Sequence, residues 1–532
     1  MDCEPNADSI RALEEQIREH ERAIVRLKRA RNSLLNVSKI PPEVLGNIFR
    51  WNVALKGDFD GLDKRSHNFL LVCHHWFEVA SRTPEVWSFW GNTLKDWARR
   101  CRRSGTVPLD LVLDGDDHHE SYFKTTLRNV LQDRATRDTI RRVHLTSDSS
   151  AALNSIIASL TPNHEELRSN SMESLVLQKG SGMPMDVSDF FANQRFPKLR
   201  RLELTNCTIS PWNHLTSRTS ALTTLNLNLS HPSLSPTTSQ LFSILASNPT
   251  LQHLGLVKHG VPNDGGNESS SRVQLRHLKG LKLAGGLRYI IKLLHQLDLS
   301  RDMDDLSLSL YGCDIADIPQ VIGPYLQDHL QRRNKPRNGL KVSVYSSHYT
   351  SAASHIRLHV SDAEDVPAQA RENAFVTITV LLDGIRHENI LKGATLDLIT
   401  HIPREEVVHF GAYCTAIPTE GAYTRFPNLR VLSFDLMPLF AVFPDPLIED
   451  GKILPSLEHV LLKDVFENNG DWSPLLTFLG RRLSSGNRLG TLVVARCSHV
   501  CQEVLKDIKG MVRELNIDHQ NTMCPFGTCR RP

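Results

Sequence analysis

The stretch LRRLEL at residues 199–204 sets the pattern that decides the fold. Apolar side chains stand at its first, fourth and sixth positions, with charged side chains between them. Neighbouring copies are MESLVL (172–177), LTTLNL (222–227), LQHLGL (251–256) and LKGLKL (278–283), and their starts are 27, 23, 29 and 27 residues apart. A strand signal that returns at this interval indicates a repeat array, in which each unit buries its apolar face against its neighbours.

Further copies extend the array in both directions. They are IRRVHL (140–145), LRVLSF (429–434), LEHVLL (457–462) and LGTLVV (489–494). Stretches with helical periodicity lie between the copies, as at 238–248 and 473–483. The segment 335–425 fits poorly, because it alternates like strands without the unit interval. The sequence therefore predicts alternating strands and helices with one irregular segment.

Three cysteines share one position relative to these strands. Cys207 and Cys497 lie eight residues after the first Leu of their units, and Cys313 has the same offset in DLSLSLYGC (305–313). The whole pattern resembles the leucine-rich repeat, whose consensus has Asn or Cys there to serve the backbone as the chain leaves the strand. The resemblance implies a strand-turn-helix solenoid in which the three cysteines are buried, unpaired thiols of low reactivity.

A second motif, IPPEVLGNIF at residues 40–49, precedes the repeats. Pro41 and Pro42 fit only at a helix start, where a missing N–H costs nothing, and Ser38 is expected to cap that start. The apolar residues that follow at helical spacing are Val44, Leu45, Ile48 and Phe49. The block up to residue 91 holds more large apolar side chains than so small a domain covers by itself. We therefore expect a partner, or the rest of the chain, to cover some of them.

The order of residues in this block resembles the F-box family. The resemblance is carried by IPxEVLxxIF (40–49), VCxxW (72–76) and PxxW (84–87), with Ile40 where the family has Leu and a loop at 56–68 longer than in the shortest members. It implies a three-helix module that docks on the Skp-type adaptor of an SCF (cullin-RING) ubiquitin ligase. The adaptor-binding residues implied in this way are Ile40, Pro41, Glu43, Val44, Leu45, Ile48, Phe49, Leu71, Val72, Trp76 and Trp87. On this interpretation, Leu45 and Ile48 are expected to be partly exposed in the isolated chain.

Residues 9–35 form a long charged stretch with a heptad pattern. The a and d positions are Ile10, Leu13, Ile17, His20, Ile24, Leu27, Arg31 and Leu34, and six of these eight are apolar. Two interpretations remain open: a coiled coil that dimerises, or a helix that packs on the chain's own next domain, because His20 and Arg31 both weaken the seam.

Composition narrows the class of protein. The chain of 532 residues is too long for one core, and its 62 basic and 59 acidic residues nearly cancel to a net charge of +3. This balance gives no general argument for nucleic-acid or membrane binding. Residues 1–10 lack the features of a signal peptide, no run of about 18 apolar residues exists, and the ten cysteines are sparse. We expect an intracellular protein of the cytoplasm, the nucleus or both.

No catalytic or metal-binding signature stands out. The chain has no GxSxG elbow, no GxxxxGK[ST] phosphate loop and no HExxH zinc helix. The pair CSHVC (497–501) and CPFGTC (524–529) matches no common zinc finger, and Cys497 is already explained by the repeat. GDDHHE (115–120) suggests a metal cluster, but an exposed loop explains it as well. The basic run 95–105 could contact phosphate, but it suits a solvated helix face better. We expect no catalytic residues, no cofactor and no metal, and hence no enzyme.

The predicted fold class is α/β, with a long N-terminal helix, a small three-helix F-box and a strand-turn-helix solenoid. The expected organisation is 1–36 heptad helix, 37–91 F-box, 92–139 linker and start of the solenoid, and 140–532 solenoid with the irregular 335–425 segment. The implied function is a non-catalytic substrate receptor of an SCF-type ligase. The alternatives are a scaffold that uses the adaptor without ubiquitylation, or a nucleic-acid-binding solenoid.

A target protein is expected on the outward face of the strands. In each unit the third, fifth and seventh positions point away from the buried leucines. The candidate target-binding residues are Arg201, Glu203, Thr205, Thr224, Asn226, Asn228, His253 and Lys282. Their mixed charge suits a protein partner better than a polyanion.

Overall fold

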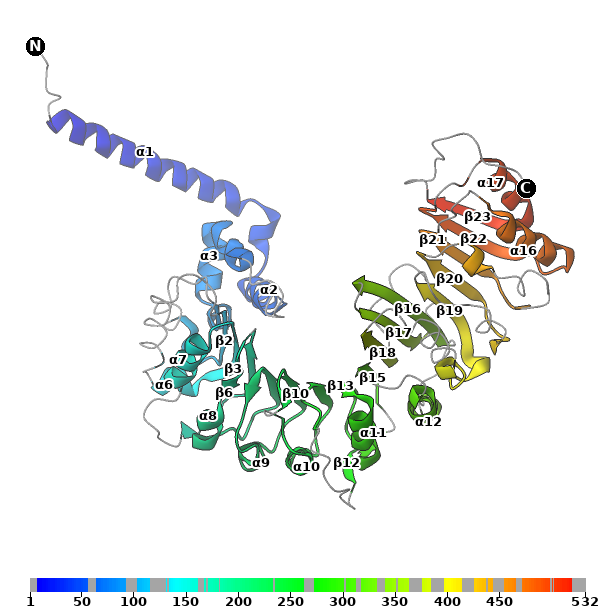
Figure 1. Cartoon of the computed structure of the whole chain (residues 1–532). Helices are drawn as coiled ribbons and strands as arrows, with labels where there is room; N and C mark the ends of the chain where they lie inside the picture. The colour runs from blue at the N-terminus through cyan, green and yellow to red at the C-terminus, as the bar shows by residue number, and fades with distance from the viewer. Residues whose placement is uncertain are drawn as a thin grey trace, which may run out of the picture. The chain divides into compact units, whose positions relative to one another are not determined.

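The structure is a computed structural model in which the chain divides into two compact units, Met1–Ala221 and Leu222–Pro532 (Figure 1). The described residues are 7–55, 64–91, 103–114, 131, 134–160, 167–168, 171–180, 182–232, 235–262, 272–300, 303–311, 317–332, 340–350, 353–362, 376–383, 397–413, 425–436, 439–443, 454–465, 471–497, 500 and 502–518.

The first unit begins with helices. Their bounds are α1 Ala7–Ser33, η1 Asn36–Lys39, α2 Pro42–Leu55, η2 Lys64–Leu71, α3 His74–Ser81 and η3 Pro84–Trp87. Leu45, Phe49 and Val53 recur every four residues along α2, so they form one buried face. That face packs in one core with residues of α3 and η3, among them Ala80 and Val86. Residues 40–87 thus form a small helical module with its own apolar core.

The repeats of the first unit follow as parallel strands. Their bounds are β1 Phe89–Gly91, β2 Leu109–Asp114, β3 Ile140–Ser147, β5 Ser174–Lys179 and β8 Arg201–Thr205. Each pairs in parallel with the next, and short outer pairs are formed by β4 Leu167–Arg168 with β7 Gln194–Arg195 and by β6 Met185–Asp186 with β9 Cys207–Thr208. The helices are α6 Arg134–Asp138, α7 Ser150–Leu160, α8 Ser188–Asn193 and α9 Asn213–Arg218.

The second unit continues the same alternation. Its strands are β10 Thr224–Leu229, β11 His253–Lys258, β12 Val273–Leu275, β13 Gly280–Gly286, β14 Leu297–Leu299, β15 Asp305–Tyr311, β16 Leu340–Thr350, β17 Ala353–Asp362, β18 Val376–Asp383, β19 Val407–Tyr413, β20 Val431–Asp435, β21 His459–Lys463, β22 Leu489–Ala495 and β23 Val512–Asp518. Its helices are α10 Thr238–Ser247, α11 Leu287–Gln296, α12 Asp317–Arg332, η7 Arg404–Glu406, α14 Leu439–Val442, α16 Ser473–Ser484 and α17 Gln502–Met511.

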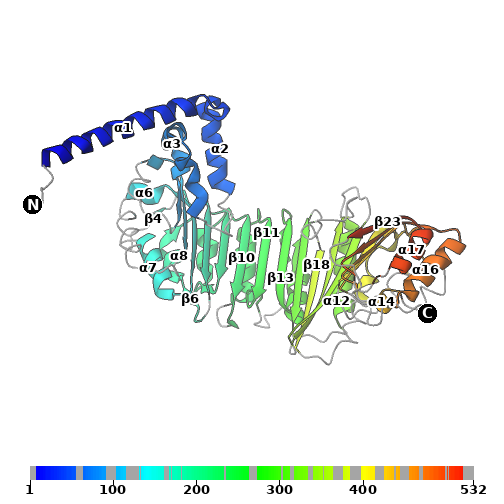
Figure 2. The same ribbon diagram turned by 90° about the horizontal axis from the view of Figure 1, so that it is seen from above.

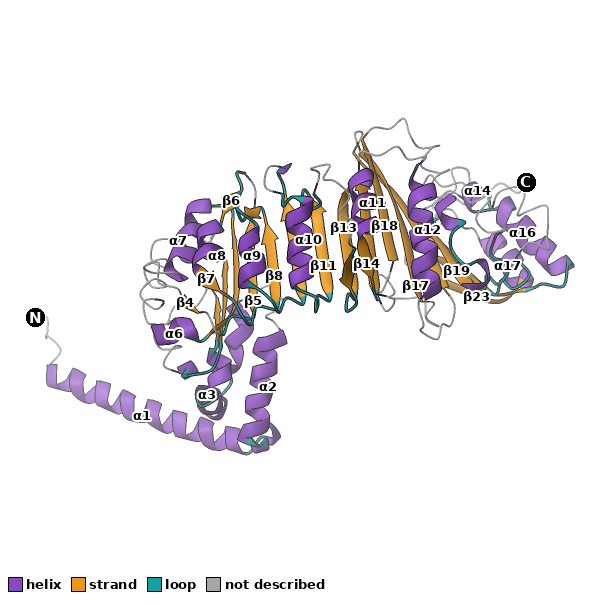
Figure 3. Ribbon diagram, turned by 90° about the horizontal axis from the view of Figure 1, so that it is seen from below, coloured by secondary structure: helices purple, strands orange, loops and turns teal. Residues whose placement is uncertain are grey.

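The helices and strands of the second unit form two layers. In Figure 3 the helices α10, α11 and α12 lie over the strands, whereas Figure 2, from the opposite side, shows β10, β11 and β13 uncovered. The predicted register is confirmed in the described repeats of both units, since the first, fourth and sixth residues of every quoted copy are at most 3% exposed. The leucines therefore form the core between the layers, and the intervening residues lie on the uncovered face of the strands.

The irregular segment has a physical explanation. β15 pairs in parallel with β18, and β16 pairs in parallel with β19, while β16, β17 and β18 are antiparallel to one another in sequence order. The chain therefore passes from β15 to β16, which of these three strands lies farthest from β15, and then returns through β17 to β18, which pairs with β15. Antiparallel strands can be joined by a short turn and need no helix between them. The regular spacing of the repeat units is therefore lost from the sequence here, although the strands remain hydrogen-bonded in one sheet.

Candidate protein-interaction sites

The helical module divides its apolar residues between an inner and an outer face. Leu45 and Phe49 are 1% exposed and Trp87 is 4% exposed, with the Trp87 indole Nε1 donating to the Ala80 carbonyl at 2.7 Å. The expected partial exposure of Leu45 is therefore wrong, and these three side chains are core residues. The reason is the helical repeat, which turns 45, 49 and 53 inward and 44, 48 and 51 outward.

The outer face of the module exposes large apolar side chains. On α2 they are Val44 (48%), Ile48 (45%) and Trp51 (58%), and at the end of η2 they are Leu71 (84%) and Val72 (53%). We call these five residues the module face. The remaining predicted adaptor residues are exposed, in the case of Pro41 and Glu43, or half-buried, in the case of Ile40 and Trp76. Trp51 was not among the predicted residues, although its spacing from Val44 and Ile48 could have identified it.

The predicted cap of α2 is also corrected. The Ser38 hydroxyl donates to the Asn32 carbonyl at 2.7 Å, so it caps the last turn of α1. Pro41 and Pro42 do begin α2, and the first intrahelical bond runs from the Leu45 N–H to the Pro41 carbonyl at 3.0 Å.

On the first unit's strands, the predicted target residues are partly paired with one another. Arg201 Nε donates to Glu203 Oε1 at 2.7 Å, across side chains that are 44% and 18% exposed. Thr205 lies two residues further along β8 and is half-buried. All three residues share one face of the strand, as the alternation predicted.

Neighbouring strands add charged residues that were missed. Asp110 lies in register with Arg142, and its carboxylate accepts from both Arg141, at 3.0 Å, and Arg142. His144 lies in the next row, and burial lowers the pKa of its imidazole, against an opposing effect of Glu203. The third and fifth positions of IRRVHL are Arg142 and His144, so the rule used for the other copies would have found them.

The second unit aligns its predicted residues in two rows. Thr224, His253, Gly280 and Asp305 are in register across four strands, and so are Asn226, Gly255, Lys282 and Ser307. His253 and Lys282 are exposed, whereas Thr224, Asn226 and Asn228 are half-buried. Burial raises the pKa of the Asp305 carboxyl, and the nearby His253 and Lys282 oppose that rise. Asp305 was not predicted because its unit, DLSLSL, was quoted only for its cysteine.

Two glycines in these rows leave space that the side chains of the neighbouring strand occupy. A Cβ on Gly280 would lie 2.8 Å from His253 Nδ1, and one on Gly255 would collide with Asn226 Oδ1. The side chains of His253 and Asn226 therefore lean over the neighbouring glycines. The result is a strand face with polar atoms at its surface and little bulk above the backbone.

The repeat cysteines lie where the pattern predicted. Cys207 and Cys497 are fully buried free thiols. Each Sγ lies near the carbonyl of the preceding strand, Leu177 at 3.8 Å for Cys207 and Leu462 at 3.5 Å for Cys497. Burial raises the pKa of Cys207 to about 12 and that of Cys497 to about 11. Cys313 lies outside the described residues.

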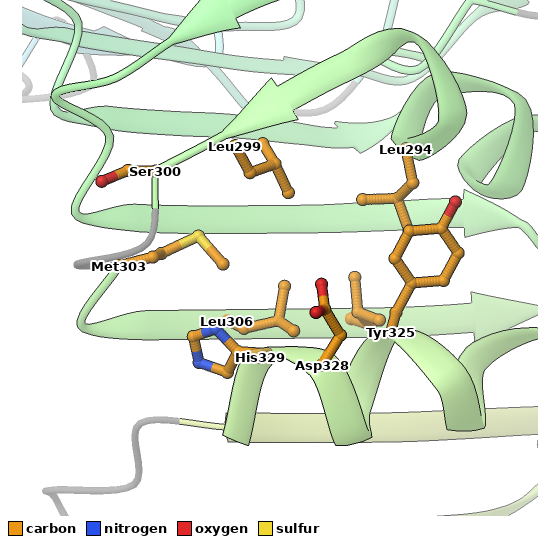
Figure 4. Close-up of a pocket in the computed structure, with 9 residues that line it drawn as sticks. Leu294, Leu299, Ser300, Met303, Leu306, Tyr325, Asp328 and His329 are labelled. Atoms are coloured by element: carbon orange, nitrogen blue, oxygen red, sulfur yellow. The ribbon is translucent and has the colours of Figure 1, made fainter. Parts of the chain in front are cut away.

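A small cavity is present in the second unit, between α11, α12 and β15 (Figure 4). It has a volume of about 50 Å³ and is lined by Leu294, Leu299, Ser300, Met303, Leu306, Leu308, Tyr325, Asp328 and His329. Burial raises the pKa of Tyr325. Ligand pockets usually span several hundred Å³, so this cavity has room for a few water molecules at most.

The described part of the chain contains no group of three or more His, Cys, Asp or Glu side chains arranged to hold a metal ion. GDDHHE, residues 95–102 of the basic run and CPFGTC lie outside it. Among the helices that the structure describes, none is both long enough and apolar enough to cross a membrane.

No protein-family model matches the chain, and no curated protein matches it. Among solved structures, a leucine-rich-repeat protein of Leptospira interrogans is similar over 81% of this chain and 99% of its own length, with 12% sequence identity and a TM-score of 0.28. A likeness of that size carries no argument. The repeat architecture is therefore established by the strand register and the buried leucines.

Proposed function

We propose that the chain is a non-catalytic substrate receptor of an SCF-type ubiquitin ligase. The module of residues 37–91 holds the Skp-type adaptor, and the strand face of the repeats captures a target protein. The chemistry then belongs to the other subunits of the ligase, and this chain contributes proximity.

The observation that carries the proposal is the module face. Monomeric proteins seldom gather large apolar side chains on so small a surface unless a partner covers them. The five residues of the module face lie outside the module's own core. For four of them, Val44, Ile48, Leu71 and Val72, the F-box resemblance implies contact with the adaptor. Burying each is worth roughly 1.5–3 kcal/mol.

The charge pattern of the strand face supports a protein target over a polyanion. Arg141 and Arg142 are paired with Asp110, and Arg201 is paired with Glu203. Cations that are already neutralised by carboxylates have little charge left for phosphates. Mixed rows of this kind suit complementary polar contacts with a protein.

Adaptor binding is tested with two matched variants on α2. Ile48→Asp places a carboxylate on the module face, and we expect it to weaken co-purification of the full chain with the adaptor at least tenfold. Arg50→Asp places the same carboxylate at an exposed position away from that face, and binding should persist. Unchanged adaptor binding by a folded Ile48→Asp chain contradicts the proposal.

Target capture is tested in cells. The full chain and its Ile48→Asp variant are purified under proteasome block, and co-purified proteins are identified by mass spectrometry. A receptor predicts proteins that bind both forms but gain ubiquitin only with the parent chain. If bound proteins show no difference in ubiquitylation, the scaffold alternative is favoured instead.

A further inference from the structure

The helix α1 presents an apolar stripe that the rest of the described chain leaves open. Figure 1 shows α1 as one long helix that projects from α2 and α3. The six apolar a and d side chains are each between 42% and 79% exposed, and they are Ile10, Leu13, Ile17, Ile24 and Leu27 on α1 and Leu34 directly after its last residue. In proteins, most of the stability of a helix comes from packing of its apolar face, so this stripe calls for a partner.

The charge along α1 is divided between its two halves. Residues 8–21 contain five acidic and two basic residues, whereas residues 22–31 contain five basic residues and no acidic one. Two such helices side by side in parallel would place Arg31 against Arg31 and His20 against His20 in the seam. An antiparallel pair places the acidic half of each copy beside the basic half of the other.

We propose that α1 binds α1 of a second copy of this chain as an antiparallel two-helix coiled coil. The register that uses the whole stripe places Ile10 of one copy against Leu34 of the other, and Ile17 against Leu27. His20 then faces Ile24, and Arg31 faces Leu13, so the two polar seam residues do not meet each other. In this register Glu14 of each copy lies beside Lys28 of the other.

The ion pairs within α1 leave that contact available. Arg18 and Arg22 lie within 2.9 Å and 3.7 Å of the Glu15 carboxylate, and all three occupy heptad positions that point away from the stripe. Glu14 and Lys28 flank the stripe at e positions, and neither forms an ion pair with another described residue. Glu14 and Lys28 are thus residues beside the seam that a second copy can satisfy.

The association itself is tested by sedimentation equilibrium of the full chain, whose monomer mass is 60.0 kDa. We expect a dimer at micromolar concentration and a monomer for the Leu13→Asp/Leu27→Asp variant, with the repeats folded in both. A parent chain that stays monomeric overturns the inference. So does a dimer that the double variant leaves intact, since another surface must then hold it.

The orientation is tested by charge exchange, which preserves helix formation. We expect Lys28→Glu to weaken the dimer about five- to tenfold, and Glu14→Lys/Lys28→Glu to restore it, because the single change replaces two attractive contacts per dimer by two repulsive ones and the double change reverses both partners. Arg29→Glu, at a position away from the stripe, is the matched control and should change affinity less than about twofold. In a parallel pair, Lys28 faces Ala23, so absence of rescue by the double exchange rules out the antiparallel arrangement. The inference does not depend on the proposed ligase function, because neither readout involves the adaptor.

Discussion

The helical module and the repeats use their apolar residues differently. In the repeats, every first, fourth and sixth residue of the quoted copies is sealed inside. The third and fifth positions of β8, β10, β11 and β13 carry polar residues or glycine, whereas apolar residues at these positions on other strands, such as Val176 and Leu461, are buried or half-buried. In the module, α2 buries Leu45 and Phe49 but also exposes Val44 and Ile48. Large apolar side chains that are exposed thus occur on the module and not on the strands of the quoted copies. Binding to the module should come from apolar burial, and binding to the strands from polar complementarity.

The sharpest test of this division compares two neighbours on α2. Leu45→Ala leaves a cavity in the module core and should lower the free energy of unfolding by about 2–5 kcal/mol, because buried leucines cost that much to truncate. Ile48→Ala should change stability by less than about 1 kcal/mol, since its side chain is 45% exposed. Hydrogen exchange of the α2 amides in the full chain measures both. Equal protection losses in the two variants would remove the distinction between inner and outer faces.

The cysteine thiols allow the accessibility of the module and of the repeats to be compared with one kind of side chain. Cys73 in the module is partly exposed, whereas Cys207 and Cys497 are buried in the repeats. We expect a thiol reagent to modify Cys73 first in the native chain, and the two repeat cysteines only on unfolding, because the thiolate is the reactive form. Mass spectrometry of peptides after a short exposure gives the order. Early modification of Cys207 would contradict the assigned repeat register.

The raised pKa of the buried thiols predicts that the free energy of unfolding depends on pH. The pKa of Cys207 is about 12 in the fold, against an ordinary value of 9.0 in the unfolded chain. Above pH 9.0 the unfolded state loses this proton first, so the stability that the buried thiol contributes is present below that pH and falls as pH rises toward 12. The loss should reach at most about 1.4 kcal/mol per pH unit. A Cys207→Ala variant is the control, and its unfolding free energy should fall less steeply over the same range.

The repeats were predictable from sequence, because a strand with one sealed face must repeat its apolar spacing wherever it recurs. LRRLEL alone gave the buried Leu199, Leu202 and Leu204 and the outward Arg201 and Glu203. The hairpin of β16 and β17 was not predictable in that way. Its two strands pair with each other through backbone hydrogen bonds, and this pairing produces no regular spacing of apolar residues in the sequence.

Contacts set by tertiary packing were also beyond the sequence. Arg482 lies in the last turn of α16 and is 2% exposed, although it is charged. Its guanidinium donates to the carbonyls of Leu454 at 2.8 Å and Leu457 at 2.9 Å, which closes the loop before β21. In the module, helical spacing identified one apolar face on α2, but only the core shows that 45 and 49 point inward while 44 and 48 point outward.

The strand face itself is tested by charge reversal. We expect Arg201→Glu combined with Asn226→Arg to weaken target capture roughly tenfold while adaptor binding is unchanged, because rows of polar side chains discriminate by charge complementarity. Arg50→Gln on α2, which like the double variant lowers the net charge by one, is the control for altered net charge. If the double variant captures the target as well as the parent chain, the target is held elsewhere, such as on the hairpin of β16 and β17.

The smallest expected effect is the response of adaptor binding to salt. The module face consists of Val44, Ile48, Trp51, Leu71 and Val72, which carry no charge, so screening has nothing to weaken there. Between roughly 0.1 and 0.5 M NaCl, the affinity for the adaptor should change by less than about threefold, whereas capture of the target by the strand face should fall further because Lys282 is an exposed cation. Binding isotherms of the full chain for each partner, recorded in the same salt series, give the two slopes. A steep slope for the adaptor would mean that charged residues of the module, such as Glu43, carry its binding, and the contrast between an apolar and a polar surface would no longer hold.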